Sequence, residues 1–266
     1  MCAGVALCTW LIGHIMVANY FFYCTTAFVI IYIIYLIMKA PKSEKKRILV
    51  ALILICMSLS FFILYFQLYE SIVLFINRTV NKNLFGISIP TTVFLGVNGA
   101  AVIIFSPILS SIYKKLEKKK KDLSITTKFP LGIFLISICF FMLALSTYTS
   151  QNMSKISCLW IIAAIVIYSI GELLTSALGV AMVTRIVPKR MYGFMMGAWF
   201  LIGNAFAANL SGNLADIANI PHSLLHNIPA ELHIYGTAFW IMGGIGLISA
   251  IIGFIISPWL KATAEL

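Results

Sequence analysis

The chain has 266 residues, of which 61% are hydrophobic and 10% are charged, and its mean hydropathy is +1.02. Soluble domains are roughly half apolar and a quarter charged, so this composition excludes water as the main solvent. The net charge of +11 does not indicate a nucleic-acid partner, because the basic residues are concentrated in alternate connections between apolar segments. We therefore predict an all-α integral membrane protein that contacts the lipid bilayer and binds no nucleic acid.

The apolar segments have the length that membrane-spanning helices need, which is about 20 residues for a hydrocarbon core about 30 Å thick. Residues 1–38 contain no charged residue, so we expect a hydrophobic helix or hairpin there, with a join near Asn19. Residues 39–47 form a basic linker, residues 48–260 contain six further spans, and residues 261–266 form a tail. The six spans are expected near 48–76, 91–113, 129–148, 156–184, 191–214 and 235–259.

The basic residues predict how the spans are oriented. They gather within 39–47, 114–128 and 185–190, whereas the intervening connections hold only Arg78, Lys82 and Lys155. Cytoplasmic connections carry an excess of Lys and Arg, so we expect the basic connections and the C-terminus to be cytoplasmic. Six spans with both ends on one side match one half of the major facilitator architecture, whose complete form has two six-helix halves.

Glu172 is an acidic residue near the middle of an apolar span, within YSIGELLTSALG. A charged carboxylate in that place costs about 2.5–3.5 kcal/mol on insertion scales, so it is expected to be neutral, paired or directed into a cavity. Burial favours the neutral acid and a nearby cation favours the carboxylate, so an acid in a cavity can change protonation when a cationic substrate arrives. The alternatives are an inert ion pair or a permanently neutral acid.

Other polar residues stand out in the early spans. Gln67 and Ser71 are four residues apart in YFQLYES and share a helix face, with Glu70 beside Ser71. Glu70 lies about two turns from Arg78, so an interfacial anchor, a gate and a substrate contact are all open for it. Asn98 supplies a donor and an acceptor in FLGVNGAA, for a substrate or for a hydrogen bond between helices.

The later spans are rich in small residues, including the GxxxG pair Gly193 and Gly197. Small side chains let helices approach closely in lipid, so we expect either ordinary close packing or a moving interface at this pair. Trp199 follows the pair and lies too deep for an interfacial aromatic belt, which leaves core packing or a cavity wall.

The cysteines show no CxxC spacing, and His222, His226 and His233 could offer ligands but have no adjacent acidic motif or cysteine, so we predict no metal and no cofactor. The sequence shows no set of nucleophile, base and orienting acid and no phosphate loop, so we predict no enzyme active site.

Four separated stretches resemble one known family. They are YFQLYESIVLFINRTV at 65–80, ISIPTTVFLGVNGAAVIIFSPILSSIYKKL at 87–116, KDLSITTKFPLG at 121–132 and GELLTSALGVAMVTRIVPKRMYGFMMGAWFL at 171–201. Residues 45–260 resemble family helices seven to twelve of the proton-dependent oligopeptide transporters, and most of all the bacterial di- and tripeptide permeases. Residues 1–38 resemble the end of the extra helix pair that bacterial members carry between their halves.

The resemblance implies a role for each polar residue. Glu172 would face the amino group of a short peptide and couple protons, Asn98 and Gln67 would contact the peptide, and Trp199 would form a pocket wall. Glu70 has no clear family counterpart and is a gate candidate. The fold implied is the C-terminal half of such a symporter in a bacterial inner membrane, completed by an N-terminal six-helix half or by a second copy. The alternative is a truncated remnant that does not transport, or a membrane interaction partner.

Overall fold

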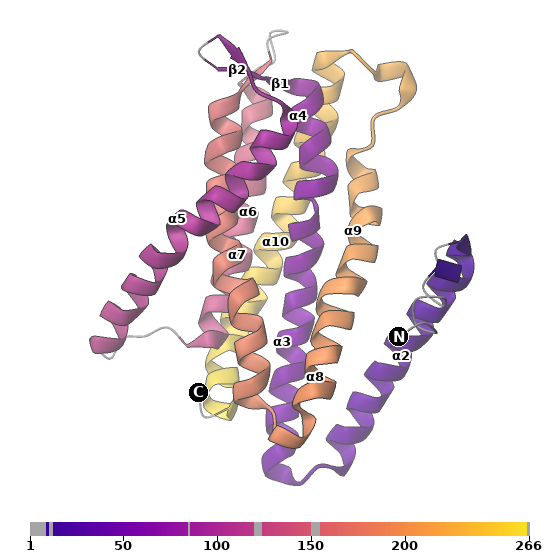
Figure 1. The fold of residues 1–266 in the computed structure, drawn as a ribbon, viewed down its shortest axis with the longest axis vertical. Coiled ribbons are helices and arrows are strands. Elements are labelled where there is room, and N and C mark those ends of the chain that lie inside the picture. Colours follow the sequence, from indigo (N-terminus) through magenta and orange to yellow (C-terminus); the bar gives the residue numbers. More distant parts are fainter. Residues whose placement is uncertain (1–8, 11–12, 85, 120–123, 150–154, 265–266) are drawn as a thin grey trace.

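The computed structural model describes residues 9–10, 13–84, 86–119, 124–149 and 155–264. These residues form a bundle of long helices (Figure 1). Seven helical segments in the described part of the chain are long and apolar enough to cross a membrane, which agrees with the six expected spans preceded by a helix. They are Met16–Lys39, Glu44–Thr79, Thr91–Lys118, Thr126–Tyr148, Cys158–Ser176, Lys189–Ala218 and Ile228–Thr263.

The described part of the N-terminal region forms one long helix, which is one of the two forms expected for residues 1–38. Helix α2 (Ile15–Lys39) is continuous through Asn19, so the predicted join at that residue is wrong. The remainder of the predicted first segment, residues 1–8 and 11–12, lies outside the described residues. The basic linker is also shorter than expected, because only two residues separate the end of α2 from the start of α3 (Lys42–Phe66). Pro41 suits this place, since it stands immediately before the helix, where the missing N–H costs nothing.

Two of the long spans contain π-helical segments. After α3, η1 (Leu68–Ile72) continues into α4 (Val73–Thr79). In the same way α8 (Tyr192–Ala198) continues through η3 (Trp199–Phe206) into α9 (Ala207–Ala215). π-Helical turns interrupt the regular hydrogen-bond ladder of an α-helix and occur often at functional sites. The segment η1 contains Glu70 and Ser71, and η3 begins at Trp199, all of which are candidate residues from the sequence.

The four remaining spans contain no π-helical segment over the residues described. The helices are α5 (Thr91–Lys118), α6 (Ile125–Tyr148), α7 (Cys158–Ile186) and α10 (Ile228–Ala264). Short strands lie in the connections that precede α5 and α7. Strand β1 (Val80–Asn81) pairs in parallel with β4 (Ile156–Ser157), and β2 (Asn83–Leu84) pairs antiparallel with β3 (Ile87–Ser88). The β1–β4 pair therefore ties the end of α4 to the start of α7.

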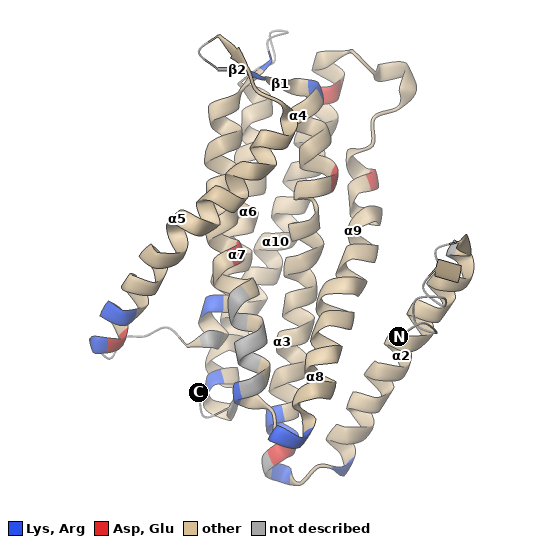
Figure 2. Ribbon diagram, viewed as in Figure 1, with Lys and Arg blue, Asp and Glu red and all other residues tan. Residues whose placement is uncertain are grey.

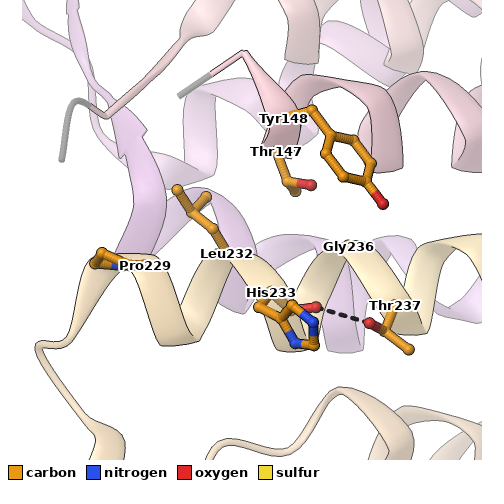
Figure 3. A pocket seen from close by; sticks show the side chains of 7 residues that line it. All are labelled: Thr147, Tyr148, Pro229, Leu232, His233, Gly236 and Thr237. Carbon is orange, nitrogen blue, oxygen red and sulfur yellow. Dashed lines mark hydrogen bonds between the residues drawn. The ribbon is translucent and has the colours of Figure 1, made fainter. Parts of the chain in front are cut away.

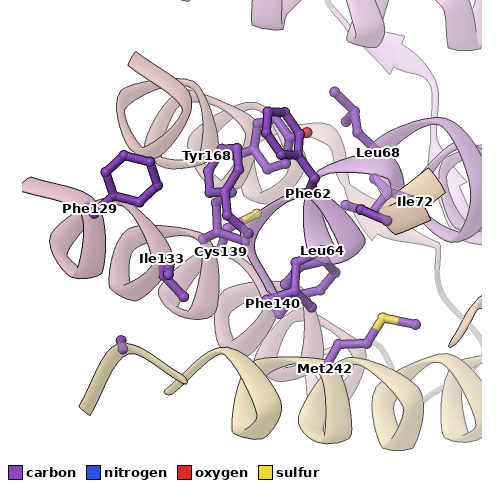
Figure 4. Packing of buried hydrophobic residues seen from close by; sticks show 14 of the residues in the cluster. Phe62, Leu64, Leu68, Ile72, Phe129, Ile133, Cys139, Phe140, Tyr168 and Met242 are labelled. Carbon is purple, nitrogen blue, oxygen red and sulfur yellow. The ribbon is translucent and has the colours of Figure 1, made fainter. Parts of the chain in front are cut away.

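The core lies where α3, α6, α7 and α10 meet (Figure 4). Phe62 and Leu64 from α3 pack with Phe140 from α6, Tyr168 from α7 and Met242 from α10. By contrast α2 and α5 are mostly exposed and lie at the sides of the bundle (Figure 1). Exposed apolar side chains on α5 face outward, and they include Val93, Ile103, Ile104, Ile108 and Ile112. Such a surface suits lipid or another membrane-spanning unit.

Glycines of α10 allow close packing against α6, whereas the GxxxG pair Gly193 and Gly197 makes no such contact. A Cβ on Gly243 would lie 2.7 Å from the Phe141 ring, and one on Gly253 would lie 2.8 Å from Pro130 Cβ. An added Cβ on Gly193 or Gly197 would have no heavy atom within 4 Å. Close helix contact at the GxxxG pair is therefore not present in this structure, because its face looks onto open space.

The charges are distributed as the topology predicts. Most Lys and Arg residues lie at one end of the bundle, the lower end in Figure 2, and fewer lie at the strand-bearing end. The three basic connections therefore share an end, as alternating spans require. The side of the membrane that this end faces stays a prediction.

Candidate functional site

Glu172 lies at the middle of α7 (Cys158–Ile186) and its side chain is half-buried. Two donors hold the carboxylate. Tyr65 OH donates to Oε1 at 3.1 Å, and Asn98 Nδ2 donates to Oε2 at 2.9 Å. Tyr65 belongs to α3 and Asn98 to α5, so a single carboxylate connects three helices. Both donors are neutral, and neither supplies a counter-charge.

A second set of bonds fixes these donors. Asn98 Nδ2 also lies 3.1 Å from Ser169 Oγ, and Ser169 donates to the Ile165 carbonyl at 2.7 Å. Tyr168 OH donates to the Tyr65 backbone oxygen at 2.6 Å, and the Tyr65 and Tyr168 rings stack with centroids 5.6 Å apart. Sequence reasoning missed both tyrosines. The available signal was that a buried Tyr hydroxyl usually needs a partner, and Glu172 is one of few acceptors in these spans.

The glycine before Glu172 lies at a close contact between α6 and α7. A Cβ on Gly171 would lie 2.8 Å from the Gly132 carbonyl oxygen, and one on Gly132 would lie equally close to the Gly171 carbonyl oxygen. The two glycines therefore bring α6 and α7 into backbone contact. Glu172, the next residue, lies on a different face of α7 from Gly171, and its side chain reaches Tyr65 of α3 and Asn98 of α5.

Gln67 and Glu70 form a separate polar cluster at η1. Gln67 is fully buried, and its Nε2 donates to Glu70 Oε2 at 3.1 Å and to the Ser211 carbonyl at 2.8 Å. Its Oε1 accepts from Ser71 Oγ at 2.5 Å, so the predicted shared face of Gln67 and Ser71 is confirmed. Ser211 Oγ lies 2.8 Å from Glu70 Oε1. The cluster joins η1 to α9, and both N–H bonds of the Gln67 amide donate within it.

Glu70 also lines a cleft of about 400 Å³ with Arg78 and Asp216. Arg78 Nη1 donates to Tyr235 OH at 3.2 Å, whereas the hydrogen bonds to Glu70 come from Gln67 and Ser211. Glu70 is therefore tied to α9. A gate role for it stays a prediction, and Ser211 is the partner that sequence reasoning did not find.

Trp199 lies in the core in this conformation. Its side chain is 2% exposed, and its ring approaches Phe62 and Phe129 edge to face at 6.3 and 5.8 Å. A Cβ on Gly179 would lie 2.0 Å from Trp199 Cζ2, so the indole covers that glycine of α7. Of the two alternatives in the sequence, core packing describes this conformation. A pocket-wall role requires the ring to become exposed.

A further cavity of about 300 Å³ lies between the end of α6 and the start of α10 (Figure 3). Thr147 and Tyr148 line it from α6, and His233 and Thr237 line it from α10. Thr237 Oγ1 donates to the His233 backbone oxygen at 2.9 Å. None of the predicted binding residues lines this cavity, so it is separate from the Glu172 site.

Comparison with known proteins decides the family. The model of the POT family, PTR2, matches residues 3–231. The chain belongs to the POT family. Its sequence is 34% identical over 257 residues to dipeptide and tripeptide permease B of Xenorhabdus bovienii and 32% identical over 257 residues to permease B of Salmonella typhimurium. Each match covers 97% of this chain and 52% of the relative.

Solved structures agree with this assignment. Tetrameric PepTSo2 matches with a TM-score of 0.77 and 29% identity, covering 92% of this POT chain and 49% of that protein. The peptide transporter POT in complex with sulfate matches with a TM-score of 0.77 and 21% identity, covering 99% and 52%. This POT chain spans about half the length of the curated relatives it matches, and it corresponds to their C-terminal half. The expected fold class, an all-α membrane protein of the major facilitator type, is confirmed.

Proposed function

We propose that this POT chain is the C-terminal half of a proton-coupled symporter for di- and tripeptides. The support is membership of the POT family and identity of 30% or more to proteins named dipeptide and tripeptide permeases. These relatives are transporters and not enzymes, which agrees with the prediction that this chain is no enzyme. The proposed location is a bacterial plasma membrane with the C-terminus in the cytoplasm, on the basis of the basic connections at one end of the bundle.

The observation that carries the proposal is the carboxylate of Glu172 at mid-helix, held by two neutral donors. An ionised carboxylate has about four lone-pair sites, and the bonds from Tyr65 and Asn98 use two of them. The remaining sites suit a cationic donor. The ammonium group of a short peptide is such a donor, and it would supply the counter-charge that the two protein donors do not.

Proton coupling would follow from the same acid. When Glu172 binds a proton it is neutral and no longer attracts an ammonium group. When it releases the proton, the carboxylate can pair with the peptide amino terminus. Glu172 alone would exchange a proton for a peptide cation, whereas symport moves both in the same direction. A second proton-carrying group in the N-terminal half would therefore have to hold the proton while the peptide occupies Glu172 and the binding face opens to the other side of the membrane.

Other residues have supporting roles in the proposal. Both bonds from Asn98 use its amide nitrogen, so its carbonyl oxygen is the atom to accept a bond from a peptide N–H. Gln67 and Trp199 are proposed to contact the peptide in a conformation that exposes them. Glu70 is proposed to open or close the η1–α9 contact. The rest of the cavity would come from an N-terminal six-helix half, or from a second copy of this chain.

The test is peptide uptake by the completed transporter. The chain is co-expressed with the N-terminal half of the Xenorhabdus bovienii permease, reconstituted in proteoliposomes, and supplied with a radiolabelled dipeptide and an inward proton gradient. We expect accumulation that depends on the gradient. The Glu172→Gln variant keeps the shape of the side chain but cannot ionise, so we expect it to lose gradient-driven accumulation by about tenfold or more.

Glu117→Gln is the matched control, because it removes an acid from the exposed end of α5. Its uptake should equal that of the parent chain. Uptake that is unchanged in Glu172→Gln would remove this residue from the mechanism. A chain that inserts correctly but transports with neither the N-terminal half nor a second copy would support the remnant alternative instead.

A further inference from the structure

A groove of about 420 Å³ lies at the basic end of the bundle, where α2 approaches α3 and α8. Its walls are mostly apolar. Tyr32 and Leu36 come from α2, Ile48 comes from α3 and Phe194 comes from α8. The Tyr32 and Phe194 rings meet edge to face with centroids 5.0 Å apart, so they close one side of the groove. The groove is distinct from the Glu172 site, with which it shares no residue.

Two cations line the same groove from different elements. Lys39 ends α2, and Arg190 belongs to the 3-10 turn η2 (Lys189–Met191) that precedes α8. Arg190 pairs with Glu44 through Nη2, but its side chain is 67% exposed and a guanidinium has five N–H donors. The Lys39 ammonium lies 4.8 Å from the centre of the Tyr35 ring. Both groups therefore keep donors for an anion.

The surroundings of the groove define its ligand more closely. Its apolar walls lead along α2, whose outer face exposes Phe28, Ile31 and Ile34 within a membrane-spanning segment. Figure 2 shows basic residues around the connection between α2 and α3 at the same end. The ligand must therefore be anionic at the depth of the headgroups and apolar deeper in the membrane. Basic pockets between membrane helices bind anionic lipid headgroups for this reason.

We infer that this groove binds an anionic phospholipid. Its phosphate lies between Lys39 and Arg190, and one acyl chain follows Tyr32, Leu36 and Phe194. A zwitterionic lipid suits the groove less, because its ammonium group would meet the two cations. Free phosphate would leave the apolar walls uncovered. The bound lipid would hold α2 against the bundle, which matters because few of the α2 side chains are buried by protein.

Native mass spectrometry of the purified chain in detergent tests the assignment directly. Phosphatidylglycerol and phosphatidylcholine are added separately, and the lipid-bound fraction is measured. We expect retained phosphatidylglycerol and little phosphatidylcholine. The double variant Lys39→Gln and Arg190→Gln should lower phosphatidylglycerol affinity by about 10- to 30-fold. The matched control is Lys45→Gln with Lys46→Gln, which removes two exposed charges at the same end but outside the groove, and it should bind as the parent chain does.

A second variant tests the apolar part without changing charge. Leu36→Trp replaces an isobutyl group by a bulkier indole ring in the groove and should also displace phosphatidylglycerol. Inorganic phosphate and glycerol 3-phosphate are added as competitors and should not displace the lipid at millimolar concentration. Equal losses in the groove variant and its control would indicate general surface charge and overturn the assignment. Undiminished binding in both groove variants, equal binding of phosphatidylcholine, or displacement by free phosphate would overturn it as well.

Discussion

Asn98 Nδ2 lies 2.9 Å from Oε2 of Glu172, and this hydrogen bond joins α5 to α7 at the middle of the bundle. Helix α5 is otherwise the most weakly covered span after α2. An amide that donates to a half-buried carboxylate has two consequences, because it keeps the acid in place and holds α5 to the bundle. The residue that is proposed to contact peptide is thus also a structural contact.

The Asn98→Ala variant should be less stable than the parent chain. It removes a donor from Glu172 and from Ser169, and interhelical hydrogen bonds in membranes contribute about 0.6–2 kcal/mol. We expect a loss of about 1–2 kcal/mol in the free energy of unfolding, measured by denaturation in mixed micelles. Ser111→Ala is the control on the same helix, since Ser111 donates only to the Pro107 carbonyl of its own turn. Equal losses in both variants would contradict the α5–α7 link.

If Glu172 pairs with the peptide ammonium, the affinity lost on blocking that ammonium should depend on whether Glu172 is present. Acetylation of the dipeptide amino group should weaken binding to the completed transporter by about 10- to 100-fold, on the scale of a hydrogen bond between charged groups. In Glu172→Gln the acetylated and free dipeptides should bind alike, because the carboxylate is already gone. Competition against a labelled dipeptide measures the affinity of the free and the acetylated dipeptide for the parent chain and for Glu172→Gln. If acetylation costs the same in both proteins, the ammonium group binds elsewhere.

The contact between Gly132 and Gly171 predicts a pair of opposite results for glycine substitution. Gly132→Ala should lower the free energy of unfolding by about 1–3 kcal/mol, because its Cβ would lie 2.8 Å from a backbone carbonyl that cannot rotate away. Gly193→Ala should be neutral or stabilising by up to about 1 kcal/mol, because open space surrounds it and Ala is the better helix former. Thermal unfolding of the two variants in one detergent measures this. Greater damage at Gly193 would place the close helix contact at the GxxxG pair after all.

The cluster around Gln67 predicts an order of stability losses. Gln67→Leu removes bonds to Glu70, Ser71 and the Ser211 carbonyl and leaves a half-buried carboxylate with fewer donors, so we expect a loss of about 2 kcal/mol or more. Ser71→Ala removes a single bond to Gln67, and we expect about 1 kcal/mol. Both losses are read from denaturation in mixed micelles. The reverse order would mean that Gln67 does not hold η1 to α9.

Several features of the site could be predicted from the sequence because they depend on local composition. A carboxylate in the apolar span of α7 is unusual wherever the span packs, so Glu172 was identifiable without a fold. The spacing of Gln67 and Ser71 predicted their contact for a similar reason, since residues four apart meet on a helix. No local spacing of this kind pointed to the partners of Tyr65 and Ser211. Each lies far in sequence from the carboxylate it binds, and only the packing of α3 with α7 and of η1 with α9 brings them together.

The amino-acid pattern was enough to place the six later spans roughly and to identify the polar residues within them, whereas it left a helix or a hairpin open for residues 1–38. It could do so because a helix in lipid must satisfy its own backbone hydrogen bonds, so its length and position follow from local hydrophobicity. Which helix faces meet depends on packing in three dimensions. Gly132 and Gly171 are in contact while Gly193 and Gly197 are not, and Trp199 lies in the core. In a bilayer, lipid covers an apolar face as well as a neighbouring helix does, so contact depends on fit between surfaces and not on hydrophobicity.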